Sequence, residues 1–174
     1  MELDNKILNK LNEQIAHELF NEHFYWACAS YFDEIGLSNI AMYFRLHAAE
    51  EKTHAEDFYD FINANGGKAI IPEVKKPMCD FKNIVHPFEL AMVAEKDTSK
   101  QIRELSKLAS ELQDFRTLEI ARKYELEQQE EEDLWSYNLK RAKLAEKDDG
   151  ALLILDHEMA QRKAFGNKKY KPCK

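Results

Sequence analysis

Two adjacent glutamates, Glu50 and Glu51, are followed closely by His54 in the segment AAEEKTHAEDF. The apolar residues of this segment, from Ala48 to Phe58, have the spacing of the buried stripe of a helix. Glu51 and His54 are three residues apart, so both side chains lie on one side of a helix and can reach the same metal ion. Carboxylates with one imidazole and no cysteine suit iron or manganese better than structural zinc, and calcium would not need the histidine.

Four segments place their core-facing side chains at alternating steps of three and four residues, as do helices that pack in a bundle. These stripes run over residues 8–32, 37–62, 88–112 and 121–145. Each contains a glutamate at a core position, and none contains lysine or arginine. The four glutamates are Glu18, Glu51, Glu95 and Glu131.

An ionised carboxylate in a low-dielectric core must be protonated, paired or bound to a metal, because its desolvation costs more than a helix can supply. A single glutamate of this kind has two simpler explanations. The core-facing side of its helix has been assigned wrongly, or its side chain reaches solvent. His54 alone is also explained as a hydrogen-bonded core histidine. The four glutamates together, without basic partners, predict cations in the core. Two divalent ions bridged by a carboxylate would balance about four acids, which is the charge balance of a di-iron site.

The connections between the stripes predict how the helices are arranged. The first and second helices, like the third and fourth, are joined by only a few residues and should be antiparallel. Between the two pairs lies GKAIIPEVKKPMCDFKNIVH. At ~3.3 Å per residue this segment can span ~60 Å, whereas a helix of roughly 27 residues is only ~40 Å long. The sequence therefore predicts an all-α, four-helix bundle with one long crossover loop.

Local signals set the expected helix ends. Ser38 is a candidate N-cap of the second helix. Pro87 fits the first turn of the third helix. Asp114 lies in the break before the fourth. A short fifth helix is expected over roughly 151–165. We therefore expect one domain over residues 1–165 and a basic tail over 166–174.

Composition excludes several classes of protein. The net charge of −7 argues against a nucleic-acid binder, which needs a basic face. No apolar run approaches the ~20 residues of a membrane span, and the N-terminal residues lack the features of a secretory signal. Cys28, Cys79 and Cys173 have no metal-motif spacing and are expected to be reduced, which predicts a cytoplasmic protein.

The chain resembles the bacterial and archaeal non-haem ferritins, which are related to animal ferritin heavy chains. The resemblance runs through LNEQIAHEL, HAAEEKTHA, ELEQQEEE and GALLILDHEM. It implies that Glu18, Glu51 and His54 bind a first iron. Glu51 would bridge to a second iron, which Glu95 and Glu131 also hold.

The same resemblance assigns further residues around these two irons. Gln128 matches the glutamine that orients ligands or oxygen species, and Tyr25 matches the tyrosine beside the site. A possible third iron site of the prokaryotic members is implied by matches at four glutamates. These are Glu50, Glu127, Glu130 and Glu131.

The function implied by the resemblance is iron storage with ferroxidase activity. Fe(II) would be oxidised by dioxygen or hydrogen peroxide at the di-iron centre, and Fe(III) would be stored as a mineral. The shell would contain 24 subunits, with the fifth helix packed around its four-fold axes. ALLIL, residues 151–155, fits such packing because an apolar stripe on a short terminal helix needs a partner. Burial within the subunit explains it equally well.

Specific positions distinguish the chain from related proteins. Bacterioferritin has its haem-binding methionine at the position of Lys52, which disfavours haem. A rubrerythrin-like peroxidase or oxidase would need a histidine at Glu130 and paired Cys-x-x-Cys motifs, and both are absent. A metal-free bundle that binds a partner helix is the remaining alternative.

Two positions depart from the ferritin pattern. Lys123 replaces a tryptophan one turn before Glu127 and is placed to pair with that glutamate or to face solvent. Glu22 is an extra acid one turn after Glu18, which either guides cations or faces a neighbouring helix end.

Overall fold

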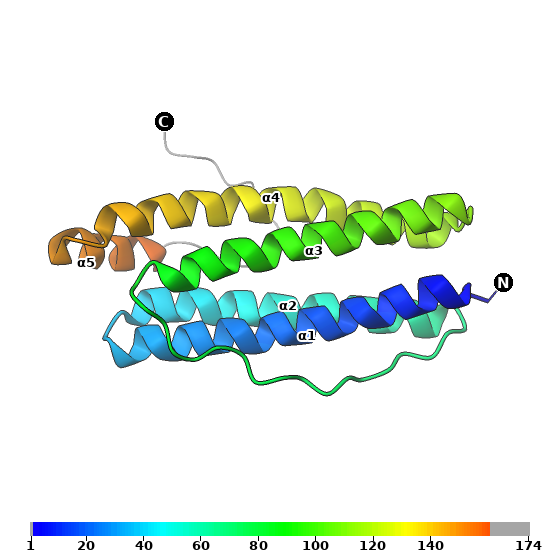
Figure 1. Cartoon of the computed structure of the whole chain (residues 1–174), viewed down its shortest axis with the longest axis horizontal. Coiled ribbons are helices and arrows are strands. Elements are labelled where there is room, and N and C mark those ends of the chain that lie inside the picture. Colours follow the sequence, from blue (N-terminus) through cyan, green and yellow to red (C-terminus); the bar gives the residue numbers. More distant parts are fainter. Residues whose placement is uncertain (1, 161–174) are drawn as a thin grey trace.

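The computed structural model describes residues 2–160, which form five α-helices and, within that range, no strand (Figure 1). The helices are α1 (Asn5–Glu34), α2 (Ser38–Ala64), α3 (His86–Glu111), α4 (Phe115–Ala145) and α5 (Asp149–Met159). The first four lie side by side as a bundle, with closest packing within the pairs α1/α2 and α3/α4. The predicted all-α bundle is confirmed.

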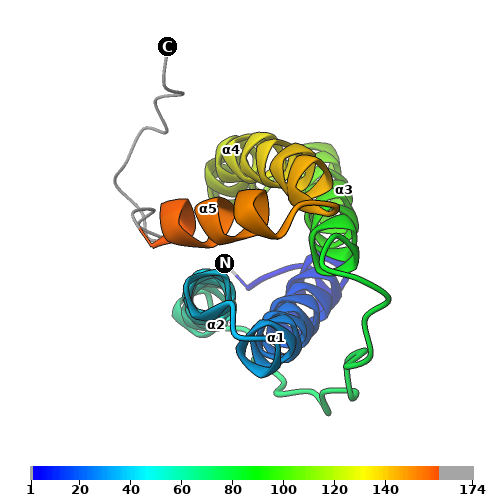
Figure 2. The ribbon, with the colours of Figure 1, turned by 90° about the vertical axis from the view of Figure 1, so that its left-hand side faces the viewer.

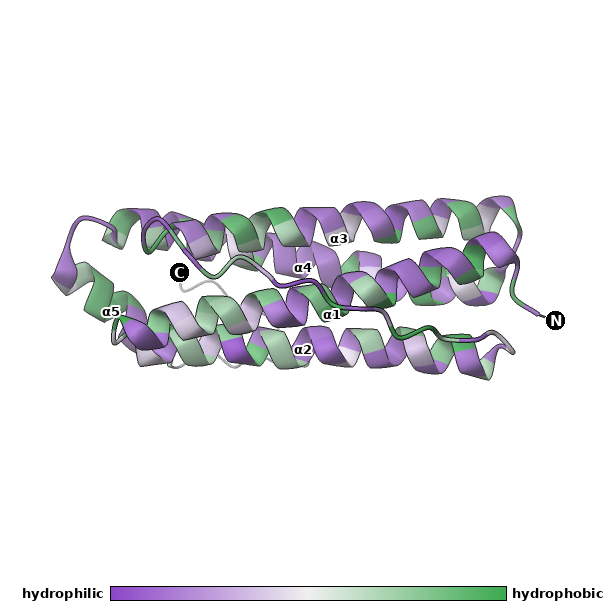
Figure 3. Cartoon of the chain, turned by 60° about the horizontal axis from the view of Figure 1, so that its bottom comes forward, coloured by the Kyte–Doolittle hydropathy of each residue, from purple (hydrophilic) through white to green (hydrophobic). Residues whose placement is uncertain are grey.

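The segment between α2 and α3 crosses from one end of the bundle to the other, as its length predicts (Figures 1 and 3). Near its start, the Asn12 amide donates to the Lys68 carbonyl at 3.3 Å and accepts from the Ile70 N–H at 2.7 Å. Near its end, the rings of Tyr31 and Phe81 lie 5.2 Å apart. Both anchors, Asn12 and Tyr31, belong to α1, so the crossover follows this helix along the bundle.

Aspartates cap four of the helix N-termini, where backbone N–H groups lack partners within the helix. Asp4, Asp114 and Asp148 cap α1, α4 and α5 from the adjoining position. The prediction that Ser38 caps α2 is wrong, because Ser38 is already the first helical residue. Its cap comes instead from α5.

Asp156 of α5 supplies the cap of α2. Its Oδ1 accepts from the backbone N–H groups of Asn39 at 3.0 Å and Ile40 at 2.9 Å. Its Oδ2 accepts from the Asn39 side chain at 2.8 Å. The carboxylate therefore fixes α5 to the start of α2 while it satisfies otherwise free donors.

The short helix α5 lies across one end of the bundle and contacts α2 and α4 (Figure 2). It begins at Asp149, two residues earlier than the predicted start at residue 151, because the side chain of Asp148 caps its N-terminus. Leu155 and Met159 are buried within the subunit, whereas Leu153 and Ile154 remain exposed. The expected end of this helix at Phe165 and the predicted tail lie outside the described residues.

Two apolar clusters make up the core, one toward each end of the bundle. One cluster contains Phe32, Phe44 and Trp135 and extends to α5. The other contains Leu11, Phe58 and additional aliphatic residues. A band of buried polar side chains separates the two clusters, and all four helices of the bundle contribute to it.

Candidate metal centre

The polar band contains the four glutamates predicted from the stripes, one from each bundle helix. The exposed fractions of Glu18, Glu51 and Glu95 are only 0%, 5% and 2%, and Glu131 is half-buried. Apolar clusters above and below restrict water at this level of the bundle. The helical repeat therefore brings four acids into a low-dielectric core, where their charges need compensation.

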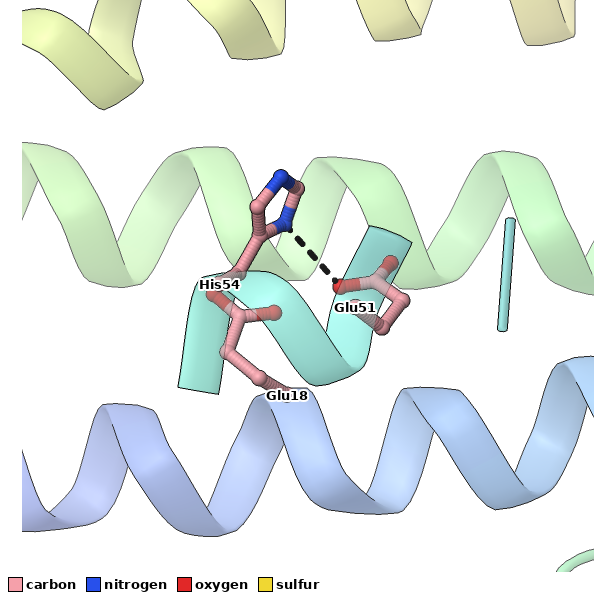
Figure 4. Close-up of side chains that lie close together, drawn as sticks. All are labelled: Glu18, Glu51 and His54. Atoms are coloured by element: carbon pink, nitrogen blue, oxygen red, sulfur yellow. Dashed lines mark ion pairs between the residues drawn. The ribbon is translucent and has the colours of Figure 1, made fainter. Parts of the chain in front are cut away.

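Glu18, Glu51 and His54 form the most deeply buried group that could hold a metal ion (Figure 4). One ligand atom from each lies within 4.8 Å of the others. His54 Nδ1 is 3.4 Å from Glu51 Oε2, and these residues come from successive turns of α2. Glu18 reaches in from α1, and the Gln14 amide donates to its Oε1 at 2.7 Å.

The second nitrogen of His54 contacts a different carboxylate. Nε2 lies 3.3 Å from Glu127 Oε1 on α4. A proton held on Nε2 by this contact leaves the lone pair of Nδ1 toward Glu18 and Glu51, as in histidines that bind metals. Glu127, which was predicted as a ligand of the third iron, is thus also placed to orient His54.

Glu95 is held by two neighbouring side chains. The Tyr25 hydroxyl donates to Oε1, and the Gln128 amide donates to Oε2 at 2.9 Å and to the Glu95 carbonyl at 3.1 Å. Tyr25 is itself fixed by stacking on Trp135, with ring centroids 5.3 Å apart. The structure therefore brings Tyr25 and Gln128 to the carboxylate that the resemblance assigns to the second iron.

Gln128 also borders a surface groove of about 420 Å³ between α3 and α4. Ser99 and Glu132 line this groove beside it, and the Ser99 hydroxyl donates to Glu132 Oε1 at 2.5 Å. Gln128 thus separates the buried Glu95 from the outer groove.

His47 is a buried site residue that was missed in the sequence. Its Nδ1 lies 3.6 Å from Glu50 Oε2 and 3.7 Å from Glu131 Oε2, and the three residues form a second candidate metal group. The spacing of His47, Glu51 and His54, at i, i+4 and i+7, was the available signal that all three share one helix face. Glu50, His54 and Glu127 form a third, overlapping group.

The electrostatics of the centre favour occupation by cations. Burial raises the pKa of Glu18, Glu51 and Glu131 above the usual range, and neighbouring carboxylates raise it further. One buried oxygen of each has no hydrogen-bond partner among residues 2–160. A divalent ion would satisfy such oxygens and remove their mutual repulsion. The donor set of carboxylates and imidazole fits iron.

The histidines differ in their charge. Burial lowers the pKa of His47 to about 3, so the imidazole is neutral. Contacts with Glu127 and the charge of Glu18 outweigh the burial of His54 and raise its pKa to about 9. A metal that binds His54 must therefore displace a proton.

Three other predicted positions lie outside these groups. Glu130 is exposed and belongs to none of the candidate groups, and Glu22 is half-buried on α1. Lys123, for which the sequence left open a pair with Glu127 or a place facing solvent, pairs instead with Asp57 on α2: its Nζ lies 2.6 Å from Asp57 Oδ2. Asp57 also accepts from the Tyr124 hydroxyl at 2.9 Å, which fixes the aspartate beside the lysine.

A model of the ferritin-like domain matches residues 8–145. The chain belongs to the ferritin family. The bacterial non-heme ferritins of Staphylococcus saprophyticus and Staphylococcus epidermidis are 29% and 31% identical to it over 160 residues. These alignments cover 92% of this chain and 96% of each relative.

Solved structures of archaeal ferritins have the same fold. An open-pore ferritin from Archaeoglobus fulgidus is 32% identical, with a TM-score of 0.91 over 94% of this chain and 100% of that one. A closed form of the A. fulgidus ferritin, engineered by mutagenesis, has a TM-score of 0.90 at the same identity and coverage. The resemblance to prokaryotic non-haem ferritins is confirmed. Within the described residues of this ferritin, no helix has the length and apolar character of a membrane span.

Proposed function

We propose that this ferritin oxidises Fe(II) at the buried carboxylate centre and stores the product as a ferric mineral. The observation that carries the proposal is the convergence of Glu18, Glu51 and His54, where two carboxylate oxygens lack hydrogen-bond partners among residues 2–160. Membership of the ferritin family supports iron as the metal. The names of the bacterial and archaeal relatives support iron storage.

In this proposal Fe(II) is the substrate, and the chain binds two ions at a fixed separation. Glu18, Glu51 and His54 bind the first ion. Glu51 bridges to the second, which Glu95 and Glu131 also bind. Two Fe(II) ions supply the two electrons that, with two protons, reduce dioxygen to hydrogen peroxide. The ferric ions then leave for the mineral.

The surrounding residues hold this arrangement in place. Glu127 orients His54, while Tyr25 and Gln128 hold the two oxygens of Glu95. Fixed ligands reduce the reorganisation that accompanies oxidation. The apolar clusters on either side exclude water and confine reactive oxygen species to the centre.

Storage requires an enclosed volume, which one subunit does not provide. We propose a shell of 24 copies in the cytoplasm, in which α5 packs against other subunits. The exposed Leu153 and Ile154 of α5 support a contact of this kind. In this account residues 1–165 form the di-iron domain, and 166–174 form a tail without a ligand role.

Aerobic addition of Fe(II) to the purified protein tests the proposal. We expect oxidation to be faster than in buffer, and we expect iron to elute with a large shell on size-exclusion chromatography. If the protein elutes as a monomer, storage in a shell is contradicted. If Fe(II) is oxidised no faster than in buffer, oxidation at the centre is contradicted.

A further inference from the structure

We infer that Thr98 is a positioning residue of the metal centre, because its hydroxyl holds α3 against α1 at the level of the predicted ligands. The inference rests on the proposed function, since it concerns how Glu95 is presented to the second ion. Thr98 acts through its helix, on which Glu95 lies three residues earlier and on the same side.

The Thr98 hydroxyl uses its full hydrogen-bonding capacity of one donor and two acceptor lone pairs. It donates to the Ala94 carbonyl within α3 at 3.1 Å. It accepts from the Asn21 side-chain amide at 3.3 Å and from His17 Nε2 at 2.8 Å, and both of these residues belong to α1. Thr98 and Asn21 are each only 1% exposed. Two of the three hydrogen bonds therefore join α3 to α1 where little water competes for them.

These hydrogen bonds lie one helical turn from the predicted ligands on both helices. Asn21 follows Glu18 by three residues and precedes Tyr25 by four, so the three share one side of α1. The Tyr25 hydroxyl donates to Glu95. One turn away, Asn21 donates to Thr98. Because α1 and α3 run in opposite directions (Figure 1), these two contacts fix a single register between the helices.

The contact between α1 and α3 determines where the second ion lies relative to the first. The first ion is assigned to Glu18, Glu51 and His54, which all come from the closely packed pair α1/α2. The ligands that complete the second position, Glu95 and Glu131, come from the pair α3/α4. A shift of α3 against α1 would therefore move Glu95 while the ligands of the first ion stay in place.

Hydrogen bonds have particular weight at this level of the bundle. α1 and α3 pack less closely on each other than do the helices within each pair. The band of buried polar residues also separates the two apolar clusters here. The bond from Tyr25 to Glu95 involves a predicted ligand, whereas the bonds of Thr98 to α1 do not. Thr98 can therefore hold the two helices whether or not an ion is bound.

Thr53 on α2 shows what a threonine does without this role. Its hydroxyl donates to the Ala49 carbonyl at 3.1 Å, which is the same bond within the helix that Thr98 makes. Thr53 is exposed and, among residues 2–160, makes no side-chain hydrogen bond to another helix. Substitution of both threonines by valine therefore separates the loss of the bond within a helix from the loss of the contacts with α1.

Calorimetric titration of the metal-free protein with Zn(II), a redox-inert probe, tests the inference. E95Q identifies the binding step of the second ion, because it removes a predicted ligand of that ion alone. We expect T98V to weaken this step by about ten-fold, as for the loss of one net hydrogen bond, and to leave the first step unchanged. T98S, which restores the hydroxyl, should recover the affinity, and T53V should bind as the wild type does.

N21A is a second variant, which decides the question if T98V does not fold. It removes one hydrogen bond from the α1 side without leaving a buried donor unpaired, and it should weaken the second step by about three-fold. Unchanged binding in N21A, equal weakening of both steps in T98V, or no recovery in T98S would overturn the positioning role alone. Wild-type protein that shows no step sensitive to E95Q would overturn the proposed di-metal centre as well.

Discussion

The Nε2 atom of His54 lies 3.3 Å from Oε1 of Glu127, on the opposite side of the imidazole from the buried glutamates. This contact connects α2 to α4 and fixes which nitrogen faces the core. A residue that the resemblance assigns to an outer iron is therefore also placed to orient a predicted ligand of the first iron. Binding of a metal by His54 Nδ1 depends on this orientation, which can be tested by substitution.

Replacing Glu127 with glutamine should weaken binding of the first ion by roughly 10–100-fold, because the carboxylate no longer fixes and polarises His54. The rate of Fe(II) oxidation at low iron concentration should fall with it. Calorimetry with Zn(II) and stopped-flow oxidation measure the two effects. E125Q, two residues earlier on the same helix, is the control. Equal behaviour of E127Q and E125Q would rule out the orienting role.

The substitution E51Q should separate stability from function. It replaces a buried carboxyl group whose pKa is raised by burial and by the neighbouring Glu95. Because a buried carboxyl without a charged partner is unfavourable, the metal-free variant should keep or increase its thermal stability. The bridging ligand is lost, so rapid Fe(II) oxidation should disappear. Calorimetric Tm and oxidation rate report these effects. A metal-free interaction module would oxidise Fe(II) no faster than buffer in both the wild type and E51Q.

The metal-free protein should become less stable as pH rises from 7 to 9. His54 keeps its proton up to about pH 9 when folded, whereas the unfolded chain releases it near 6.5. A raised pKa contributes stability that is complete below the unfolded pKa and is lost as pH rises through the folded pKa. The raised pKa values of Glu18 and Glu51 act in the same direction.

This pH dependence can be measured as the Tm at pH 7 and pH 9. The lowered pKa of His47 has the opposite effect on stability, but only below about pH 6.5. In the Zn(II)-loaded protein, protons compete with the metal, so the dependence should weaken or reverse. H54Q should also weaken it. A Tm that rises with pH in the metal-free wild type would show that His54 is not protonated in the folded state.

Asp57 should keep Lys123 away from the metal centre. In D57N the lysine is free to pair with Glu127 one turn later, which competes with the Glu127–His54 contact. An exposed pair is worth at most about 1 kcal/mol, so Zn(II) affinity should fall by up to about five-fold. The double variant D57N/K123Q should recover it. A loss that persists in the double variant would assign the effect to Asp57 itself.

Removal of the Asp156 cap should destabilise the subunit. D156A leaves the N–H groups of Asn39 and Ile40 without their acceptor and should cost about 1–2 kcal/mol. D60N, at an exposed position of α2, provides a control. Thermal unfolding measures the difference. An unchanged Tm in D156A would mean that water replaces the cap at no cost.

The sequence was sufficient where local periodicity and chain length determine the structure. Glu18, Glu51, Glu95 and Glu131 could be placed in the core because each occupies a core-facing position of a stripe that contains no lysine or arginine. The crossover followed from a comparison of its reach with the length of a helix.

Contacts between distant segments were not predictable in the same way. The cap of α2 comes from Asp156, more than a hundred residues away, so Ser38 was the only cap visible locally. Lys123 pairs with Asp57 across the bundle rather than with Glu127 on its own helix. His47 lies one position from Ala48 of the stripe, and its role depends on Glu131 from another helix.

The number of Fe(II) ions oxidised per subunit in the first rapid phase tests the central claim most directly. Metal-free protein would be mixed with increasing Fe(II) in air-saturated buffer, and the fast absorbance change would be followed by stopped flow. Two ions held by the carboxylate centre predict saturation at about two Fe(II) per subunit, and no such phase in E51Q. A rapid phase of the same size in E51Q, or none in the wild type, would contradict the account.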